Sequence, residues 1–351
     1  MRTAITRARV FDGHALTEPR TVVLDGPLIT ADTTTGGARV VDARGAVLLP
    51  GLVDAHVHVT TEAQLTALRD HGVTTALDMA AFPITVVDAL RSLPGLPEIR
   101  TAGVPAAAPG GHHARVPGFP PEAEVAGPAD ADAFVAARLA EGSDHLKIVL
   151  EGDLMPVPTV VALVAAAHAR GLLVVAHTAD PAAVAIAAEA GVDVLTHLPL
   201  GAPLDPAPVA ALAGRVVVPT LTMMEGAAER AGAPQAFAGT LASAGALHRA
   251  GVPLLAGTDA NDQPAVPFSP EHGPSLHHEL ELLVAAGLTP VEALNAATTR
   301  PAGLLGLPDR GAVRPGLRAD LVLVDGDPLA DIADTRAITR VWSAGVEHVA
   351  A

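Results

Sequence analysis

From residue 51 to about residue 298, short apolar segments alternate with Ala- and Leu-rich segments, and this alternation limits the fold more than any other feature. The apolar segments have the length of strands and are hydrophobic almost throughout, which is typical of parallel strands buried on both faces. The longer segments between them predict helices, for example over residues 131–140, 157–169, 181–190, 236–250 and 290–298. We expect eight strands, at residues 51–58, 73–79, 98–104, 145–150, 172–178, 192–198, 216–222 and 253–259.

Strands that alternate with helices indicate the α/β class, and eight repeats predict a (β/α)8 TIM barrel. The chain of 351 residues is long enough for such a barrel with additional structure. An open, doubly wound sheet is the alternative. The glycine-rich motif G-x-G-x-x-G, which usually supports that fold, follows none of the eight segments.

The two ends of the chain have a different pattern, with short β segments separated by Gly and Asp turns. At the N-terminus they cover residues 3–11, 21–25, 39–42 and 46–49, and at the C-terminus residues 319–325 and 338–345. Neither end has enough strands to bury a face by itself. We therefore predict a small composite β-sandwich domain made of residues 1–48 and 308–351, beside a barrel of residues 49–307.

The net charge, the apolar segments and the cysteine content limit which kinds of partner and location we expect for this chain. The formal net charge of −16 disfavours binding to a phosphate backbone, so we expect no nucleic-acid partner. The N-terminus lacks the apolar core of a signal peptide, and no apolar run reaches the length that spans a membrane. With no cysteine in the chain, disulfides and thiolate metal sites are excluded, which fits a cytoplasmic protein.

The first barrel segment contains His56 and His58, two residues apart. In an extended strand such residues project to the same side, so both imidazoles enter one space. Two histidines on an apolar strand can also be hydrogen-bonded core residues, and by themselves they do not decide between these interpretations. Later segments favour a metal site, because further polar residues occur where strands end: Lys147, His177, His197 and Asp259.

In a barrel, the carboxyl ends of the strands form the face that carries the active site, so these six residues should converge on one cavity. Lys147 is the only lysine in the sequence, and it lies between Leu146 and Ile148 within an apolar run. A salt-bridged lysine and a helix-capping aspartate are the ordinary alternatives for Lys147 and Asp259.

With these motifs the chain resembles the metal-dependent amidohydrolases, specifically binuclear members related to imidazolonepropionase-like hydrolases and prolidases. The resemblance spans nearly the whole chain. It rests on residues 49–58 (LPGLVDAHVH), 144–148 (DHLKI), 175–177 (VAH), 193–197 (DVLTH), 256–259 (AGTD), 298–302 (TTRPA) and 316–323 (GLRADLVL).

The resemblance implies a site with two divalent metal ions, for which Zn²⁺ suits the ligands best. His56, His58 and Asp259 would hold the more buried ion, and His177 and His197 the more exposed one. Lys147, converted by CO₂ to N6-carboxylysine, would bridge the two ions. A hydroxide between the ions would attack a carbonyl, and Asp259 would act as the proton shuttle.

Several further residues are candidates for substrate binding. His112, His113 and Arg115 follow the third strand on the expected active-site side. His145 alternates onto the same side as Lys147, and His272 lies in the long segment after the eighth strand, which suits a substrate loop.

The first functional hypothesis is hydrolysis of a C–N (amide) bond in a small substrate such as an N-acyl amino acid or a dipeptide. A lactonase or esterase could use the same binuclear site. A mononuclear deaminase or cyclic amidine hydrolase is a further alternative, although such enzymes generally lack the lysine of the fourth strand. A non-catalytic, metal-stabilised binding protein is the last hypothesis. The exact substrate, the metal and a homo-oligomeric state are left open by the sequence.

Overall fold

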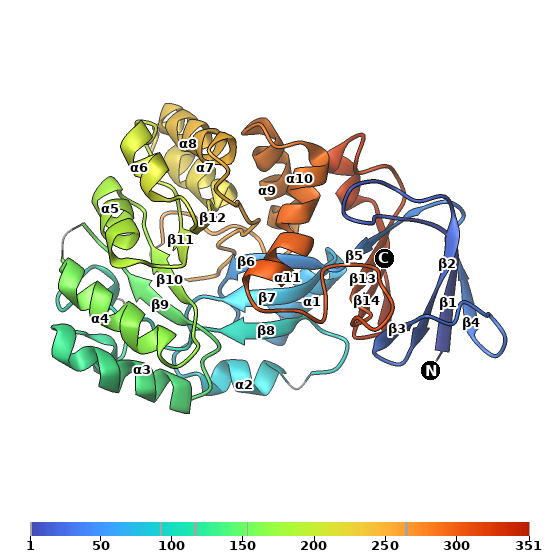
Figure 1. The fold of residues 1–351 in the computed structure, drawn as a ribbon, viewed down its shortest axis with the longest axis horizontal. Helices are drawn as coiled ribbons and strands as arrows, with labels where there is room; N and C mark the ends of the chain where they lie inside the picture. The colour runs from blue at the N-terminus through green and yellow to red at the C-terminus, as the bar shows by residue number, and fades with distance from the viewer. Residues whose placement is uncertain (1, 92, 116–117, 153, 264–265, 351) are drawn as a thin grey trace.

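Strands from both ends of the chain meet in one sheet. The structure, a computed structural model, describes residues 2–91, 93–115, 118–152, 154–263 and 266–350. Within these residues, an eight-stranded sheet has the order β15-β14-β13-β5-β1-β2-β3, with β4 paired to β1 (Figure 1). Its strands are β1 (Arg2–Val10), β2 (Arg20–Asp25), β3 (Leu28–Thr30), β4 (Arg39–Asp42), β5 (Val47–Pro50), β13 (Leu321–Val324), β14 (Ile338–Ser343) and β15 (Val346–Val349).

The two ends are joined where β13 runs antiparallel to β5, with Leu321 opposite Pro50. Their apolar side chains form a small core that includes Ile5, Leu48 and Trp342, all fully buried. Strands β3 and β15 were not expected from the sequence, since each is short and largely exposed. The shared sheet agrees with the expected pairing of the two ends, whereas the β-sandwich and its boundaries stay predictions.

The central part of the chain has the predicted strand–helix alternation. Among the described residues, seven strands form two parallel sheets, β6-β7-β8 and β12-β11-β10-β9. They are β6 (Leu52–Val57), β7 (Val73–Asp78), β8 (Glu98–Thr101), β9 (Leu146–Val149), β10 (Val174–His177), β11 (Val194–Thr196) and β12 (Val216–Val218). Nearly all their residues are buried, as expected of strands covered on both faces.

The two parallel sheets are connected on both sides by isolated bridges. Ala106, after β8, bridges Ile148 of β9. On the other side, residues 254–260 bridge β12 through Val217↔Leu254 and β6 through Val57↔Ala260. These contacts bring the strand ends around a common centre, and the closed eight-stranded barrel stays a prediction.

All eight expected strands of the central part are shorter than predicted, and proline and left-handed residues account for two of these differences. The expected strand 253–259 forms only isolated bridges, because Pro253 has no N–H to donate and Asp259 has a left-handed backbone (φ 58°). The expected strand 216–222 ends at Val218 because Pro219 and a left-handed Thr220 (φ 49°) interrupt it. The chain then enters a helix instead.

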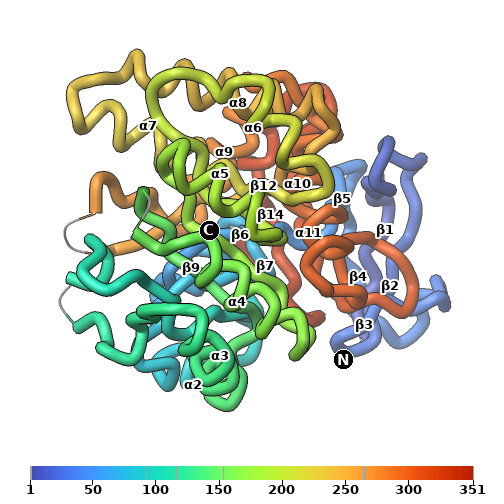
Figure 2. The backbone as a smooth tube through the Cα atoms, turned by 60° about the vertical axis from the view of Figure 1, so that its left-hand side comes forward, coloured from blue at the N-terminus to red at the C-terminus, as the bar shows by residue number. Residues whose placement is uncertain are grey.

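Helices follow most strands and cover their outer side (Figures 1 and 2). They are α1 (Glu62–Asp70), α2 (Thr85–Arg91), α3 (Ala131–Ala140), α4 (Val157–His168), α5 (Pro181–Ala190), α6 (Pro206–Ala211), α7 (Leu221–Arg230), α8 (Phe237–Arg249), α9 (Pro274–Ala285), α10 (Pro290–Ala296) and α11 (Thr299–Leu304). Helix α5 illustrates the local signals. The Asp180 carboxylate accepts the N–H of Ala183, Pro181 occupies the first turn, and Gly191 ends the helix at φ 84°.

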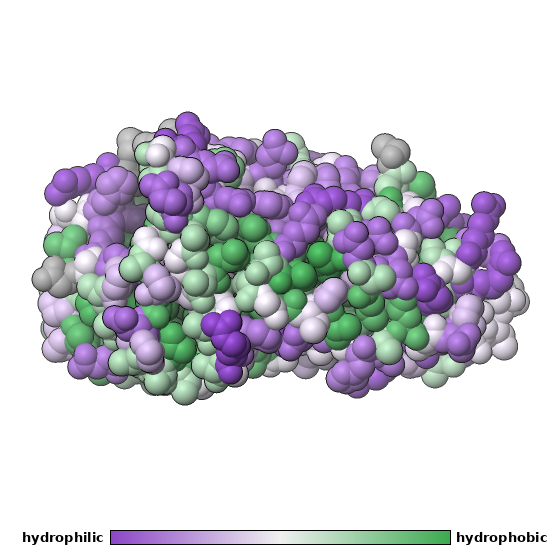
Figure 3. Space-filling model, turned by 90° about the horizontal axis from the view of Figure 1, so that it is seen from above, coloured by the Kyte–Doolittle hydropathy of each residue, from purple (hydrophilic) through white to green (hydrophobic). Residues whose placement is uncertain are grey.

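Hydrophobic and hydrophilic residues share the surface. The face seen from above carries hydrophobic residues along its middle and hydrophilic residues toward its edges (Figure 3). Of the helices in the described ranges, none is both long enough and apolar enough to span a bilayer.

Candidate metal centre and substrate cavity

The ends of the parallel strands surround a cavity of about 570 Å³. His56 lies in β6 and His58 just beyond it, Lys147 lies in β9, His177 ends β10, and His197 directly follows β11. Asp259 reaches the same space from the segment after β12 and α8. The structure thus brings the six predicted metal ligands to one cavity: His56, His58, Lys147, His177, His197 and Asp259.

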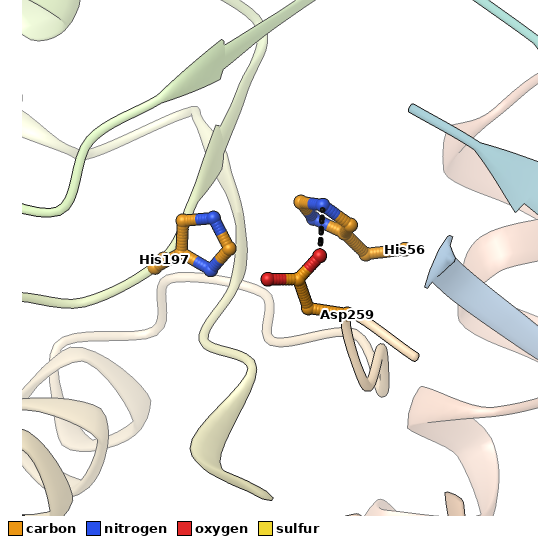
Figure 4. A group of neighbouring side chains, drawn as sticks. All are labelled: His56, His197 and Asp259. Atoms are coloured by element: carbon orange, nitrogen blue, oxygen red, sulfur yellow. Dashed lines mark ion pairs between the residues drawn. The ribbon is translucent and has the colours of Figure 1, made fainter. Parts of the chain in front are cut away.

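Asp259 lies against the first histidine pair. Its Oδ1 is 3.3 Å from His56 Nε2 and 3.1 Å from His58 Nε2. His56, His197 and Asp259 each offer a ligand atom, and these atoms lie within 4.8 Å of one another (Figure 4). Two ligand atoms on a tetrahedral zinc, each about 2.0–2.1 Å from it, lie roughly 3.3–3.4 Å apart. The spacing of the Asp259 and histidine atoms therefore fits a shared ion.

A buried carboxylate, Asp54, holds the Asp259 segment in place. Its two oxygens accept the N–H of His56 (3.2 Å), the N–H of Thr258 (3.0 Å) and the hydroxyl of Thr258 (2.7 Å). The Asp259 N–H donates to the carbonyl of His56 at 2.8 Å. Gly257 permits this approach, because a Cβ there would lie 2.9 Å from the His56 nitrogen. These contacts support the left-handed backbone of Asp259.

The second histidine pair packs beside the first. The ring centroids of His177 and His197 are 4.7 Å apart, and those of His56 and His197 are 4.9 Å apart. Burial lowers the pKa of His56 and His177 well below the ordinary value and that of His197 to about 4. These imidazoles are therefore neutral at neutral pH and each keeps a lone pair, as a metal ligand requires.

Asp259 supplies negative charge to this cluster. Burial would raise its pKa, but its close contacts with His56 and His58 hold the pKa well below its ordinary value. Neutral imidazoles with an ionised carboxylate form a donor set suited to a divalent cation.

Lys147 lines the cavity and is 4% exposed. Its Nζ donates to Thr196 Oγ1 at 3.0 Å. Burial lowers the lysine pKa to about 7, against the opposing attraction of Asp259. An amine that is neutral in part at neutral pH can add CO₂, so the environment of Lys147 is compatible with carboxylation.

The loop after β8 contributes His112, His113 and Arg115 to the cavity wall. Glu151, just beyond β9, accepts the N–H groups of His112 (2.5 Å) and His113 (2.9 Å) and also bonds His113 Nδ1. Burial would raise the pKa of Glu151, but these bonds, led by the one from His113, lower it to about 2. Its position directly after an expected strand was a usable signal, but the sequence prediction did not include it.

Two expected substrate-binding residues do not border the cavity in the described part of the chain. His272 Nε2 is within hydrogen-bonding distance, 2.9 Å, of the carbonyl oxygen of His58. His145 precedes Lys147 by two residues, so it projects to the same side but nearer the amino end of β9. Both side chains are buried.

Much of the cavity lining is apolar, which the sequence prediction did not foresee. It includes Met223, Met224, Ala227 and Ala231, on or just after α7, and residues from other loops: Met79, Phe82, Phe119, Leu200, Val266 and Pro267. Phe82 and Phe119 pack edge to face, with centroids 5.6 Å apart. Their contribution could not be read from the sequence because these residues come from separate loops.

The model of the Amidohydrolase family matches residues 47–347. An uncharacterized protein of Mycobacterium tuberculosis is 31% identical over 342 residues, covering 87% of this chain and 85% of that protein. The imidazolonepropionase of Deinococcus radiodurans is 31% identical over 211 residues, which cover 58% of this chain and 49% of that enzyme.

Among solved structures, a Xaa-Pro dipeptidase with bound methionine in its active site superposes with a TM-score of 0.87. The match covers 99% of this chain and 100% of that one, at 24% identity. At this level of identity the likeness concerns the fold.

Proposed function

The chain belongs to the amidohydrolase family and is a hydrolytic enzyme that acts on C–N bonds, and we propose that it cleaves the amide bond of a small substrate in the cavity described above. The observation that carries this proposal is the convergence of His56, His58, His177, His197, Lys147 and Asp259 from separate strand ends. We further propose that the two parallel sheets and residues 253–260 form one (β/α)8 ring, with residues 1–48 and 308–351 as a composite domain.

The family uses divalent metal ions, and we propose that this chain holds two ions with a ligand set suited to Zn²⁺. One ion would be held by His56, His58 and Asp259. The other would be held by His177 and His197, with carboxylated Lys147 shared between them. When bound, such ions supply Lewis acidity that polarises a carbonyl and lowers the pKa of water.

The residues of the chain supply proton transfer and orientation. Asp259 is ionised, so its carboxylate accepts the proton of the attacking water and then delivers it to the leaving nitrogen. His112 and His113, held by Glu151 at the rim, are placed to bind the substrate's polar groups. The apolar wall on α7 excludes water from one side of the reacting bond.

The cavity favours an uncharged acyl group over a free α-amino group. Asp259 is the one carboxylate among the described residues that line it, and Arg115 offers a cation for a substrate carboxylate. An ammonium group would find no further acidic partner among them, whereas an apolar acyl chain would meet Met223, Met224 and Ala227. N-acyl amino acids therefore fit better than dipeptides.

The alternatives use the same cavity differently. A lactonase or esterase would need no change in the proposed residues, since attack on a carbonyl tolerates several leaving groups. Lys147, buried among the imidazoles, disfavours a mononuclear deaminase or cyclic amidine hydrolase. A purely metal-stabilised binding protein is disfavoured by membership of a hydrolase family.

The test is hydrolysis by the purified, zinc-replete chain of N-acyl amino acids, dipeptides and lactones. We expect N-acyl amino acids to be cleaved, and Asp259→Asn to lower kcat by about 10²–10⁴-fold while metal content is retained. The matched control is Asp262→Asn, an exposed carboxylate three residues away, which should leave kcat unchanged. Full activity of Asp259→Asn, or no hydrolysis of any amide, would contradict the proposal.

A further inference from the structure

His197 makes a hydrogen bond that defines which of its nitrogens carries the proton. Its Nδ1 lies 2.6 Å from Thr220 Oγ1, and the same hydroxyl lies 2.8 Å from the carbonyl oxygen of Pro219. A carbonyl oxygen only accepts, so the single hydroxyl proton of Thr220 goes to Pro219. The hydroxyl oxygen must then accept from His197, which makes His197 the Nδ1–H tautomer with a lone pair on Nε2.

This tautomer suits the position of His197. Its ring lies beside those of His56 and His177, and a ring nitrogen of His197 is grouped with His56 and Asp259 (Figure 4). Since Nδ1 is engaged by Thr220, Nε2 is the atom free to act as a ligand. Partners on the far nitrogen of a ligating histidine commonly orient the ring in this way.

Thr220 is held in an unfavourable backbone conformation. Its φ and ψ are 49° and 50°, in the left-handed region that is strained for a β-branched residue. Thr220 also occupies the N-cap position of α7, yet its hydroxyl makes no capping bond to that helix because Pro219 and His197 engage it. The first N–H groups of α7 therefore need another acceptor.

Glu279, from α9, supplies that acceptor. One carboxylate oxygen accepts the N–H of Leu221 at 3.0 Å, and the other accepts the N–H and hydroxyl of Thr222 at 2.8 and 3.0 Å. The side chain is fully buried, and a carboxylate at a helix N-terminus is favourably placed. Burial raises the pKa of Glu279 to about 7, and the three donors limit that rise.

We propose that Glu279 is a positioning residue: by capping α7 from α9, it holds Thr220 where its hydroxyl fixes the tautomer and orientation of His197. Glu279 lies on α9, behind the cavity-lining helix α7, and is not among the lining residues. The expected effect of Glu279 on metal affinity rests on the proposed function, in which His197 is a metal ligand. The expected effect of Glu279 on the His197 tautomer does not depend on that role.

The test follows the imidazole nitrogens of the full-length, ¹⁵N-histidine-labelled chain by NMR, before and after dialysis against a chelator. We expect the His197 signal, assigned with His197→Gln, to show the Nδ1–H form. Thr220→Val, which removes the hydroxyl, should shift the chelator-treated protein toward the Nε2–H form. Thr220→Ser, which keeps the hydroxyl, should not. An Nε2–H form in the unaltered protein, or an unchanged tautomer in Thr220→Val, would overturn the proposal.

Glu279 itself is tested against Glu281, a carboxylate on the same helix that pairs with Arg336 instead. Glu279→Gln should mix the His197 tautomers and weaken zinc binding, measured by competition with a chelator, by about 10–100-fold. Glu281→Gln should change neither. An unaltered tautomer in folded Glu279→Gln would overturn the proposal. An altered tautomer with unchanged zinc binding would support the positioning role and contradict the assignment of His197 as a ligand.

Discussion

His277 shows how one buried imidazole affects stability in acid. Its Nδ1 lies 3.0 Å from Thr335 Oγ1, whose own proton goes to the carbonyl of Ile332, and its Nε2 has no hydrogen-bond partner among the described residues. Burial, assisted by Arg336 and His71, lowers the pKa of His277 to about 3. Protonation is therefore easy in the unfolded chain and difficult in the folded one.

Between the unfolded pKa of about 6.5 and the folded value, the unfolded state binds the additional proton. Stability from His277 is complete above about pH 6.5 and is lost as pH falls below it, by up to about 1.4 kcal/mol per pH unit. We expect His277→Asn, which keeps a donor toward Thr335, to reduce the loss of unfolding free energy between pH 7 and 5 by about 2 kcal/mol. Urea denaturation at each pH measures this.

The control for that series is His14→Asn, at an exposed imidazole, which should leave the pH dependence unchanged. Stability curves for His277→Asn that run parallel to those of the unaltered protein would show that His277 does not titrate as inferred.

At the scale of elements, α7 forms the apolar wall of the cavity through Met223, Met224 and Ala227. We expect Ala227→Phe to fill part of the space available to an acyl chain. It should lower kcat/KM for long-chain N-acyl amino acids by about 10-fold or more, with a much smaller effect on N-acetyl substrates. Glu229→Gln, on the exposed end of the same helix, is the control. Equal losses for short and long acyl groups would place the acyl chain elsewhere.

Elements with a strong local signal could be predicted from the sequence. Helix α5, with Asp180, Pro181 and Gly191 at its ends, has the expected boundaries, as does α3. The start of α7 could not be predicted, because the apolar run through Leu221 also suits a strand and the break depends on the backbone of Thr220. The irregular path near Asp259 could not be predicted either, because it depends on the left-handed backbone of Asp259.

Those cavity residues that lie at the end of a predicted strand could be predicted from the sequence. His56, His177 and His197 reach the cavity for that reason. Glu279 was not predictable, since its partners lie on α7, more than 50 residues earlier, and no periodicity records that contact. His272 failed to reach the cavity wall for the opposite reason, because an unforeseen bond to the His58 carbonyl holds it.

At the scale of the whole molecule, Arg310 links the α/β unit to the chain segment that returns to the terminal sheet. Arg310 is 6% exposed, and its guanidinium donates to Thr75 of β7 and to Glu98 of β8, both at 2.8 Å. Arg310→Ala removes a positive charge that pairs with the Glu98 carboxylate. We expect this change to lower the unfolding free energy by about 3 kcal/mol. Chemical denaturation measures the loss.

Arg7→Ala is the matched control, because Arg7 pairs with Asp42 on an exposed part of the same terminal sheet and should contribute nothing measurable. Equal stability of the Arg310 and Arg7 variants would mean that the buried link does not hold the two parts of the molecule together.

In the proposed metal centre, strand-end side chains hold a pair of divalent ions around Lys147. The direct measurement is the number of divalent ions per full-length chain, determined by elemental mass spectrometry after removal of loosely bound metal. We expect about two ions per chain, falling to about one or fewer in Lys147→Ala. One ion per chain, unaffected by Lys147→Ala, would contradict the account.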